Sequence, residues 1–293
     1  MDDQQWLAER FEEHRPRLRA VAYRMLGSLS EADDAVQDAW LRVSRADTSE
    51  VENLGAWLTT IVARVSLNLL RSRKTRREAS LDVHVPDPVI DPADGTDPEH
   101  EALLADSVGL ALLVVLDTLT PPERLAFVLH DMFGVPFEQI APIVDRSSDA
   151  ARQLASRARR RVRGAAPVPD ADLSAQWEVV EAFLAAAHEG NFDALLEVLD
   201  PDVVLRADGG GVADLSRLVR GAAAVASSAT MWSRVGLDMR RALVNGTPGF
   251  VSLRDGRPFS VAAVTISGGR IVEMDILADP ERLARLDLAL LDG

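Results

Sequence analysis

The sequence predicts a multidomain protein in which two all-α domains precede an α+β domain. The chain has 293 residues, which exceeds the roughly 100–200 residues of a typical single domain. Apolar residues recur at helical spacings up to about residue 164, whereas strand-like segments occur only in the last block of the chain. The hydrophobic content of 47% is sufficient to build packed cores.

Residues 1–78 predict a helical bundle. Pro16 indicates a kink or a restart in the first helix, and Gly27 ends that helix. Ser30 is expected to cap the second helix, with Asp33 as a weak capping-box partner. A third helix is expected from about residue 54 to residue 73.

Residues 79–107 predict an acidic, proline-rich linker. This segment holds eight acidic residues and no basic residue, and its prolines prevent a regular helix. Helical structure is expected again from about Glu99. A second proline-containing linker at 165–174 precedes the last block.

Residues 108–164 predict a helical domain that contains a helix-turn-helix. Asp145 and Arg146 form the turn, and Ser147 or Ser148 caps the second helix. Arg and Gln side chains on the outer face of that helix suit the major groove, where Arg pairs with guanine and Gln with adenine. An ordinary helical hairpin with a charged surface is the alternative. The expected packing face consists of Ala150, Leu154, Ala158 and Val162.

Residues 175–293 change structural class. Two helices, around Trp177 and at 192–199, are followed by strand-like segments at 203–206, 249–253, 260–266 and 270–276. Asp-Gly at 255–256 and Gly-Gly at 268–269 are hairpin-turn signals. This order of elements predicts an α+β domain.

The charge pattern separates two basic clusters from an acidic remainder. The net charge of −14 excludes a uniformly basic nucleic-acid binder. Residues 64–77 nevertheless hold six basic residues and no acid, and residues 146–163 hold seven arginines and one acid. Two such clusters are typical of a protein that contacts nucleic acid at two places, although two solvated helix ends would give the same pattern.

The composition also excludes several kinds of site. The chain has no cysteine, which excludes disulfides, thiolate zinc sites and cysteine nucleophiles. The five histidines show no metal-ligand spacing. The N-terminus is charged, and the longest apolar stretch, at 110–116, is far shorter than the ~20 residues of a membrane-spanning helix. We therefore expect a cytoplasmic protein that uses no metal, no cofactor and no membrane.

Three segments carry a resemblance to a known family. LTPPERLAFVLHDMFGVPFEQIAPIV, followed by a serine-capped arginine helix, resembles region four of sigma-70 family factors and above all of the extracytoplasmic-function group. LGSLSEADDAVQDAWLRV resembles region two of that group, and LGAWLTTIVARVSLNLLRSRKTRRE resembles its −10-element helix. Their order over residues 1–164 implies a factor that directs RNA polymerase core to promoter DNA and starts transcription.

The resemblance implies roles for individual residues. Residues 34, 37, 38 and 41 share a helical face, which suits docking on the β′ and β subunits of polymerase core, although a solvated acidic face is the alternative. The loop at 46–55 would take up a flipped −10 base. The implied polymerase-binding residues are Asp33, Asp34, Gln37, Asp38 and Leu41. The implied −10 contacts are Arg64, Asn68, Arg71, Arg73, Lys74, Arg76 and Arg77. The implied −35 contacts are Ser147, Ser148, Arg152, Gln153, Ser156, Arg157 and Arg160.

Residues 175–290 resemble a SnoaL-like domain of the NTF2-like fold, which implies a cone of curved mixed sheet wrapped by helices around a cavity. A SigJ-like branch of extracytoplasmic-function factors carries this fusion. Three motifs of that branch are present in altered form, as HVPDP at 84–88, DGGGV at 208–212 and ADPERL at 278–283. We expect these segments to meet and to regulate activity in cis through Pro86, Asp87, Pro88, Asp208, Gly209, Gly210, Gly211, Asp279, Pro280 and Leu283.

An enzymatic role for the last domain is the main alternative. SnoaL-like enzymes need a carboxylate or histidine that shuttles protons and a donor that stabilises an oxyanion. The chain's one tyrosine, Tyr23, lies in the first domain, His188 suits a helix end, and Asp208 suits a turn or an interface. We therefore expect no catalytic residue. A bifunctional factor whose last domain binds or converts an unidentified small ligand stays open, whereas a repressor is disfavoured because it needs no region-two block.

Overall fold

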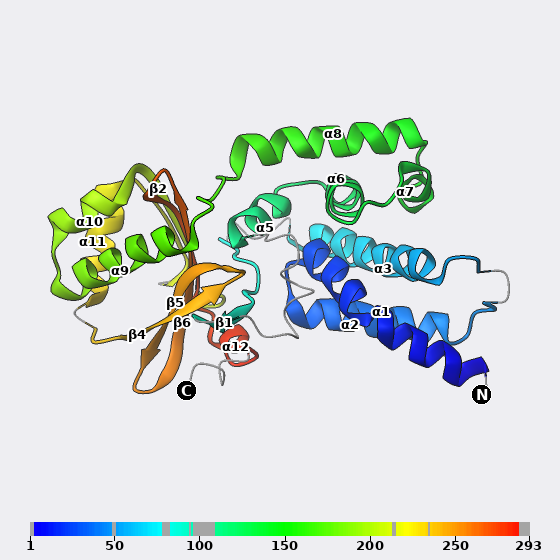
Figure 1. The fold of residues 1–293 in the computed structure, drawn as a ribbon, viewed down its shortest axis with the longest axis horizontal. Helices are drawn as coiled ribbons and strands as arrows, with labels where there is room; N and C mark the ends of the chain where they lie inside the picture. Colours follow the sequence, from blue (N-terminus) through cyan, green and yellow to red (C-terminus); the bar gives the residue numbers. More distant parts are fainter. Residues whose placement is uncertain are drawn as a thin grey trace. The chain divides into compact units, whose positions relative to one another are not determined.

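The computed structural model describes residues 3–48, 51–77, 83–93, 95, 109–212, 215–233 and 235–286 (Figure 1). These residues form two compact units. The first contains the described residues up to 77 together with residues 115–165, and the second contains residues 83–93, 109–114 and 166–286. The division falls within helix α5 (Leu110–Asp117).

The first unit is helical in its described part, as the sequence predicts. The short π-helical turn η1 follows α6 directly, and α7 and α8 form the helix-turn-helix. The elements are α1 (Asp3–Leu26), α2 (Leu29–Val43), α3 (Leu54–Arg77), α6 (Pro121–Phe127), η1 (Val128–Met132), α7 (Phe137–Val144) and α8 (Ser148–Ala165).

Local sequence explains where the first helices begin and end. Gly27 has a φ of 67°, a left-handed conformation that ends α1 at little steric cost. Ser28 then caps α2 by accepting a hydrogen bond from the backbone N–H of Glu31, so the prediction that Ser30 is the cap is wrong by two residues. Pro16 lies inside a continuous α1, and α3 extends beyond its expected end at residue 73.

Within the first unit, the N-terminal bundle packs against the helices that follow residue 120. Helix α3 contacts α6 and α7. The buried Arg24 places its guanidinium carbon 5.1 Å from the centroid of the Phe133 ring, and Arg17 donates to the Phe133 carbonyl at 3.1 Å. Arg124 is also buried; it donates to the Arg24 carbonyl at 3.0 Å and forms an ion pair with Asp117. The two helical domains therefore form one body.

The second unit is built on a mixed sheet with the strand order β1-β4-β5-β6-β7-β2-β3. Strands β2 and β7 are parallel, and the other neighbouring pairs are antiparallel. This arrangement confirms the expected α+β class. The strands are β1 (Ile90–Pro92), β2 (Leu199–Asp208), β3 (Arg217–Arg220), β4 (Asp238–Val244), β5 (Thr247–Arg254), β6 (Arg257–Ser267) and β7 (Arg270–Leu277).

Residues 83–93 do not form a separate linker. Ile90 pairs with Val244 at the edge of the sheet. The Val89 N–H donates to the Asn245 side chain at 3.1 Å, and the Asn245 N–H donates to the Val89 carbonyl at 2.8 Å. The prolines exclude a helix as expected, but this part of the 79–107 segment belongs to the sheet of the C-terminal domain. The helix start expected near Glu99 lies outside the described residues.

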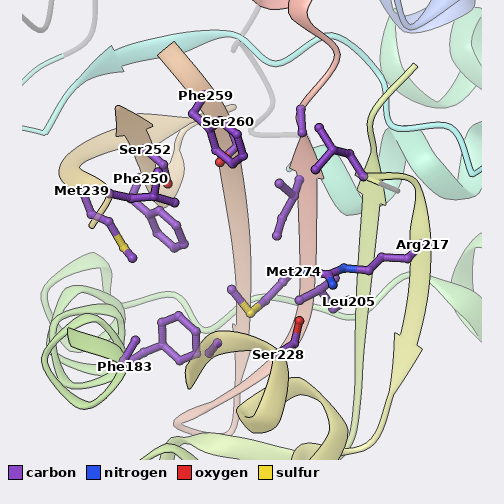
Figure 2. A pocket seen from close by; sticks show the side chains of 16 residues that line it. Phe183, Leu205, Arg217, Ser228, Met239, Phe250, Ser252, Phe259, Ser260 and Met274 are labelled. Carbon is purple, nitrogen blue, oxygen red and sulfur yellow. The ribbon is translucent and has the colours of Figure 1, made fainter. Parts of the chain in front are cut away.

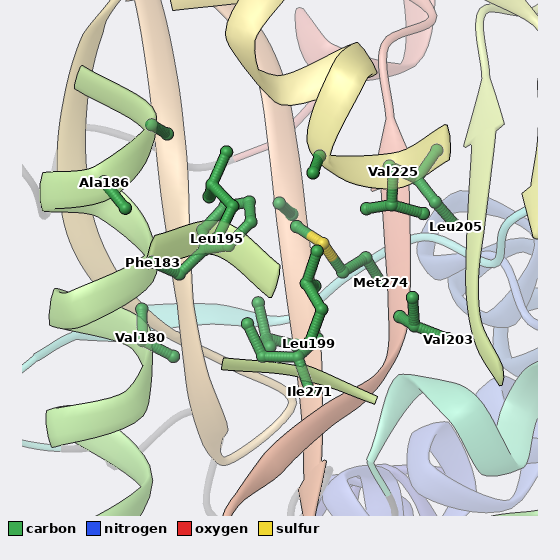
Figure 3. Packing of buried hydrophobic residues seen from close by; sticks show 14 of the residues in the cluster. Val180, Phe183, Ala186, Leu195, Leu199, Val203, Leu205, Val225, Ile271 and Met274 are labelled. Carbon is green, nitrogen blue, oxygen red and sulfur yellow. The ribbon is translucent and has the colours of Figure 1, made fainter. Parts of the chain in front are cut away.

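Three helices pack against the sheet, and their buried side chains form the core with it (Figure 3). They are α9 (Leu173–Glu189), α10 (Phe192–Val198) and α11 (Ala222–Ser233), and a short α12 (Pro280–Leu283) follows β7. Phe183 from α9, Leu195 from α10 and Met274 from β7 belong to one buried cluster. Removal of each such side chain from water contributes about 1.5–3 kcal/mol to the folding free energy, so this core stabilises the domain.

No helix in the described part of the chain has both the length and the apolar content that a membrane crossing requires. The His, Asp and Glu side chains of the described residues form no group of three or more that could hold a metal ion.

Candidate functional sites

One face of α2 presents the residues expected to bind polymerase. Asp33, Asp34 and Gln37 are exposed, and Leu41 is 48% exposed although it is apolar. The opposite face packs into the bundle through Ala32, Ala35, Val36, Ala39 and Val43. The exposed face is therefore a mixed apolar and acidic surface, which a partner of complementary charge could cover.

Two of these carboxylates already have partners in the chain. Asp33 accepts a hydrogen bond from Arg19 at 2.7 Å, and Asp38 accepts one from Arg42 at 2.8 Å. Both pairs are largely exposed, so each contributes little to stability and can exchange for another partner. Asp38 and Asn68 both line a groove of about 350 Å³ between α2 and α3. A polymerase-binding candidate and a −10 candidate thus share one groove.

The expected −10 residues on α3 fall into three groups. Arg64, Asn68 and Arg71 are exposed at spacings of four and three residues, which places them on one face. Arg73 is half-buried; its guanidinium donates to the Leu26 carbonyl at 2.8 Å and to Glu31 at 3.1 Å. A phosphate contact by Arg73 would require these bonds to break. The side chains of the remaining candidates lie outside the described residues: Lys74, Arg76 and Arg77.

The loop before α3 is described except at residues 49 and 50. The side chain of Asn53 accepts a hydrogen bond from the Ala56 N–H at 3.0 Å, which fixes the start of α3. A Cβ atom at Gly55 would lie 3.0 Å from the His14 ring, so α1 closely approaches this end of the loop.

The helix-turn-helix has the expected turn and a shifted packing face. Asp145 has a φ of 55°, which reverses the chain between α7 and α8. Ser147 accepts a hydrogen bond from the Ala150 N–H at 3.2 Å, so Ser147 caps α8 and Ser148 is its first residue. The buried residues of α8 are Ala151, Ala155 and Ala158, whereas the expected Ala150, Leu154 and Val162 are half-buried. The shift arises because α8 packs on both α6 and α7.

The outer face of α8 keeps its expected residues exposed. Arg152 lies 3.2 Å from Asp149, and its guanidinium carbon is 5.3 Å from the centroid of the Phe137 ring. Arg157 lies 3.4 Å from Glu123. The exposed set is Arg152, Gln153, Ser156, Arg157 and Arg160.

A buried glutamate on α6 holds α8 in place. Glu123 accepts hydrogen bonds from the Thr120 hydroxyl at 2.7 Å and from Arg161 at 3.1 Å. Burial alone would raise the pKa of Glu123, but the hydrogen bonds from Thr120 and the charges of Arg161 and Arg157 outweigh burial and lower it. The carboxylate therefore stays charged and fixes how the arginine-rich helix is presented.

A polar cluster joins the proline-rich segment to the C-terminal domain. We call it the linker clamp, and it consists of His84, Val85, Asp87, Asp208 and Arg282. The Arg282 guanidinium donates to Asp208 at 2.8 Å, to Asp87 at 2.7 Å and to the Val85 carbonyl at 2.6 Å. Asp208 also accepts from the Val85 N–H at 2.9 Å and lies 3.2 Å from the His84 ring nitrogen. The clamp thus fixes both the backbone and a side chain of the 84–87 segment.

Most of the other expected regulatory residues support the clamp. Asp279 caps α12 by accepting from the Glu281 and Arg282 N–H groups, which positions the Arg282 side chain. Pro280 opens that helix and Leu283 is buried. Pro86 and Pro88 are buried in the held segment.

Steric space and backbone conformation explain why glycine is needed at two of the positions after Asp208. A Cβ atom at Gly210 would collide with the Asp279 carboxylate, and the φ of 58° there favours glycine. A Cβ atom at Gly209 would collide with Leu215, whereas Gly211 has open space.

The electrostatics of the clamp favour a charged Asp208. Burial alone would raise its pKa, but hydrogen bonds from His84 and from the Val85 and Gly210 N–H groups, together with the charge of Arg282, lower the pKa to about 2. The carboxylate is therefore fully ionised at neutral pH.

A pocket of about 90 Å³ lies inside the C-terminal domain, between the sheet and helices α9 and α11 (Figure 2). Its wall is mainly apolar and includes Phe183, Met239, Phe250, Phe259 and Met274. The polar side chains that line it are Arg217, Ser228, Ser252 and Ser260.

Sequence reasoning missed several residues that build these sites. Arg282 lies within the ADPERL segment, but the sequence alone predicts no partner for its guanidinium; its place two residues after the helix-opening Pro280 is the available signal. The buried Arg124 and the half-buried Arg217 gave no signal, because sequence pattern does not distinguish such arginines from exposed ones. Asn-Gly at 245–246 is a strong hairpin signal that would have located β4.

Two family models match the helical part of the chain. Residues 10–76 match the family Sigma-70 region 2, and residues 109–162 match the family Sigma-70, region 4.

Full-length relatives extend the similarity to the C-terminal domain. The ECF RNA polymerase sigma factor SigJ of Mycobacterium tuberculosis is 38% identical over 287 residues, which cover 93% of this chain and 91% of that protein. The probable ECF RNA polymerase sigma factor SigI of the same organism is 34% identical over 284 residues, 96% of each chain. The crystal structure of the extracytoplasmic function sigma factor SigJ of M. tuberculosis matches with a TM-score of 0.76 and 34% identity, covering 96% of this chain and 99% of that one.

Proposed function

Because the chain belongs to the extracytoplasmic-function (ECF) group of sigma-70 factors and so directs RNA polymerase to promoters, we propose that its C-terminal domain controls this activity in cis. The observation that carries the proposal is the linker clamp. Arg282 and Asp208 of the C-terminal domain hold residues 84–87, which lie between region two and region four. The domain therefore holds the chain segment that connects the two regions that contact DNA.

The roles of the exposed faces follow from the same premise. The α2 face with Asp34, Asp38 and Leu41 docks on the β′ and β subunits of polymerase core. The α3 face with Arg64 and Arg71 contacts the opened −10 strand, where cations along the backbone and a pocket for an unstacked base are needed. The exposed face of α8 contacts the −35 element, and its arginines supply both base and phosphate contacts.

Promoter geometry explains why control of the connecting segment would control activity. The −10 and −35 elements are separated by roughly 25 base pairs, which is about 85 Å of B-form DNA at about 3.4 Å per base pair. Helices α3 and α7 contact each other in the first unit, and even α8, at about 1.5 Å per residue, is only ~27 Å long. Region two must therefore separate from region four before both elements can be bound.

The clamp limits that separation. Residues 83–93 are fixed on the sheet by the clamp and by β1. Once released and extended, this segment would span about 35 Å at ~3.3 Å per residue. While the segment is held, region two and region four cannot use this length to move apart. We infer that the clamped form is the less active one.

In vitro transcription with full-length protein and polymerase core tests this function. Arg282→Met removes the bonds from Arg282 to its three clamp partners while keeping an unbranched side chain, and we expect several-fold more transcript and faster open-complex formation. Arg285→Met, an exposed arginine on the same segment, is the matched control. Equal or lower activity of Arg282→Met, with an unchanged circular dichroism spectrum, would contradict control by the clamp.

We infer that the C-terminal domain regulates rather than catalyses, and that the protein acts in the cytoplasm with polymerase. Among the described residues that line its pocket there is no Asp, Glu, His or Tyr that could shuttle a proton. Assays for isomerase or hydrolase turnover with the purified protein test this inference, because reproducible turnover that is lost on Arg217→Met would contradict it.

A further inference from the structure

The pocket of the C-terminal domain places a hydroxyl group against a mainly apolar wall. Phe183 and Phe250 both line the pocket, and the centroids of their stacked rings are 6.4 Å apart. Ser228 lines it from α11, and Figure 2 shows the Ser228 side chain pointing from this helix into the pocket. The pocket therefore offers apolar surface together with a hydrogen-bonding group.

The Ser228 hydroxyl lacks the partner that serine and threonine hydroxyls often find within a helix, the carbonyl four residues earlier. On the same helix, Ser227 donates to the Ala223 carbonyl at 2.8 Å. Thr230 donates to the Ala226 carbonyl at 3.2 Å. Ser228 is 9% exposed, and its Oγ atom is buried with no hydrogen-bond partner among the described residues. Because native structures retain few such groups, this hydroxyl is an independent sign that the pocket holds a partner for it.

The groups that line the pocket suit a neutral ligand. A charged ligand loses its hydration when it enters an apolar site, and a hydroxyl group does not replace that hydration. Arg217 also lines the pocket, but it already has an interaction within the chain, so the ligand depends on the hydroxyl rather than on this cation. An uncharged molecule with an acceptor atom needs only what Ser228 supplies.

We propose that this pocket binds a small neutral carbonyl compound. Ser228 donates a hydrogen bond to the carbonyl oxygen, and the alkyl groups lie among Phe183, Phe250 and Met274. A carbonyl oxygen accepts but has no proton to donate, so one hydrogen bond from Ser228 leaves no donor without a partner. An alcohol brings a second hydroxyl proton, and burying that proton without an acceptor weakens binding.

The volume limits the size of the ligand. A cavity of about 150 Å³ holds benzene, which has about six heavy atoms. The pocket here is about 90 Å³. By proportion, a ligand of roughly four to five heavy atoms fits without rearrangement, which is the size of a short-chain ketone such as butanone. The site extends beyond the proposed control by the clamp and does not depend on it.

NMR titration of the full-length protein, with isotope-labelled methionine methyl groups, tests the site with butanone as the probe. Met239 and Met274 line the pocket, whereas Met25 is buried in the first unit. We expect butanone to shift the Met239 and Met274 signals saturably, with a midpoint below about 10 mM, and to leave the Met25 signal in place. Ser228→Ala should weaken binding about three- to tenfold, because it removes one hydrogen bond. Ser227→Ala, which removes an exposed hydroxyl from the same helix, is the matched control and should bind as the unmodified protein does.

Two further probes test the chemical class. Butan-2-ol, with the same carbon chain, and butanoate, a carboxylate of similar size, should each bind at least several-fold more weakly than butanone. Equal or tighter binding of either would overturn the assignment to a neutral carbonyl compound. The site itself is rejected if no saturable shift occurs up to about 10 mM, as expected for a pocket that holds only water, or if Met25 shifts equally. Unchanged butanone affinity in Ser228→Ala, with an unaltered circular dichroism spectrum, would also reject it.

Discussion

The Asp208 carboxylate stabilises the C-terminal domain in a pH-dependent manner. Its side chain is 6% exposed, and its pKa of about 2 lies below its ordinary value of 3.8. A shift of this size corresponds to about 2 kcal/mol of folding free energy. Because the folded pKa is the lower one, that free energy is fully present above about pH 4 and is lost as the pH falls toward 2.

The first prediction concerns this carboxylate. Asp208→Asn should lower the free energy of unfolding by about 2 kcal/mol at pH 7, and the difference from the unmodified protein should shrink as the pH falls from 4 toward 2. Urea denaturation at several pH values measures it. Asp238→Asn, an exposed acid on β4, is the control, and a constant difference across this range would contradict the assignment.

Single residues also show where the sequence was and was not informative. The exposed positions of α2 follow directly from the helical period of 3.6 residues, because residues three and four positions apart lie on the same face and are buried or exposed together. The cap of α2 was misplaced because Ser28 and Ser30 are equally good caps, and only the position of Gly27 in the folded chain decides between them. The sequence predicts Arg73 to be a surface cation, because it does not show that the Leu26 carbonyl lies within hydrogen-bond distance of the Arg73 guanidinium.

At the scale of the element, the α2 surface and the arginine-rich face of α8 can be tested separately. Both helices pack one face into the first unit and leave the other exposed. Substitutions on the exposed faces should change binding without unfolding the protein, since surface changes usually alter stability by no more than about 0.5 kcal/mol.

The second prediction concerns α2. Replacing Asp38 with Asn and Leu41 with Ala together should weaken binding to polymerase core by about tenfold or more, because the surface loses a charge and its exposed apolar side chain. A pull-down titration with core enzyme measures this. Gln5→Ala on α1 serves as a control, and unchanged core affinity in the double variant would reject the docking face.

The third prediction concerns α8. Loss of a base-specific contact should reduce the free energy of promoter binding by about 1–3 kcal/mol and relax the preference at one base pair of the −35 element. A phosphate contact should weaken all sequences alike and reduce the salt dependence by about one counterion. Promoter libraries assayed with Arg152→Ala and Arg157→Ala distinguish the two, with Arg163→Ala as the control. The recognition-helix assignment fails if neither variant alters −35 use.

Elements differed in how far the sequence predicted them. The long helices and the strands β5, β6 and β7 follow from local periodicity and from turn residues at 255–256 and 268–269. The three-residue β1 has no local signal, because it exists only where Ile90 meets Val244 on a strand about 150 residues away. Proline in a segment argues against a central strand, and β1 is accordingly at the sheet edge.

At the scale of the whole molecule, region two and region four lie in one compact body, which the sequence did not predict. The expected picture of two domains joined by a flexible segment rested on charge and proline content. The structure adds long-range contacts between α1 and the chain after α6, formed by Arg17 and Arg24 around Phe133. No sequence pattern connects an arginine to an aromatic ring more than 100 residues away.

The fourth prediction concerns this body. Phe133→Ala removes the ring that Arg17 and Arg24 face, and each such contact contributes about 0.5–2 kcal/mol. The closed population should fall several-fold or more, and promoter binding should strengthen. The chain has no cysteine, so a pair introduced at the exposed Gln5 and Gln139 can carry labels for distance measurements.

Distances between the labels should become longer and more broadly distributed in Phe133→Ala. Phe192→Ala, which removes an exposed ring from α10, should leave them unchanged. An unaltered distribution in Phe133→Ala would show that this ring does not hold the closed body together.

Ala278 belongs both to the wall of the pocket and to the support of the linker clamp. Its side chain lines the pocket, its N–H donates to the Asp208 carbonyl at 2.7 Å, and it directly precedes Asp279, which positions Arg282. Any free energy exchanged between the two sites must be reciprocal, because linkage makes the effect of a ligand on the clamp equal to the effect of the clamp on the ligand. If a molecule that fills the pocket tightens the clamp, promoter DNA that opens the clamp must weaken the binding of that molecule by the same factor, so occupancy of the pocket would report whether the factor is engaged on DNA.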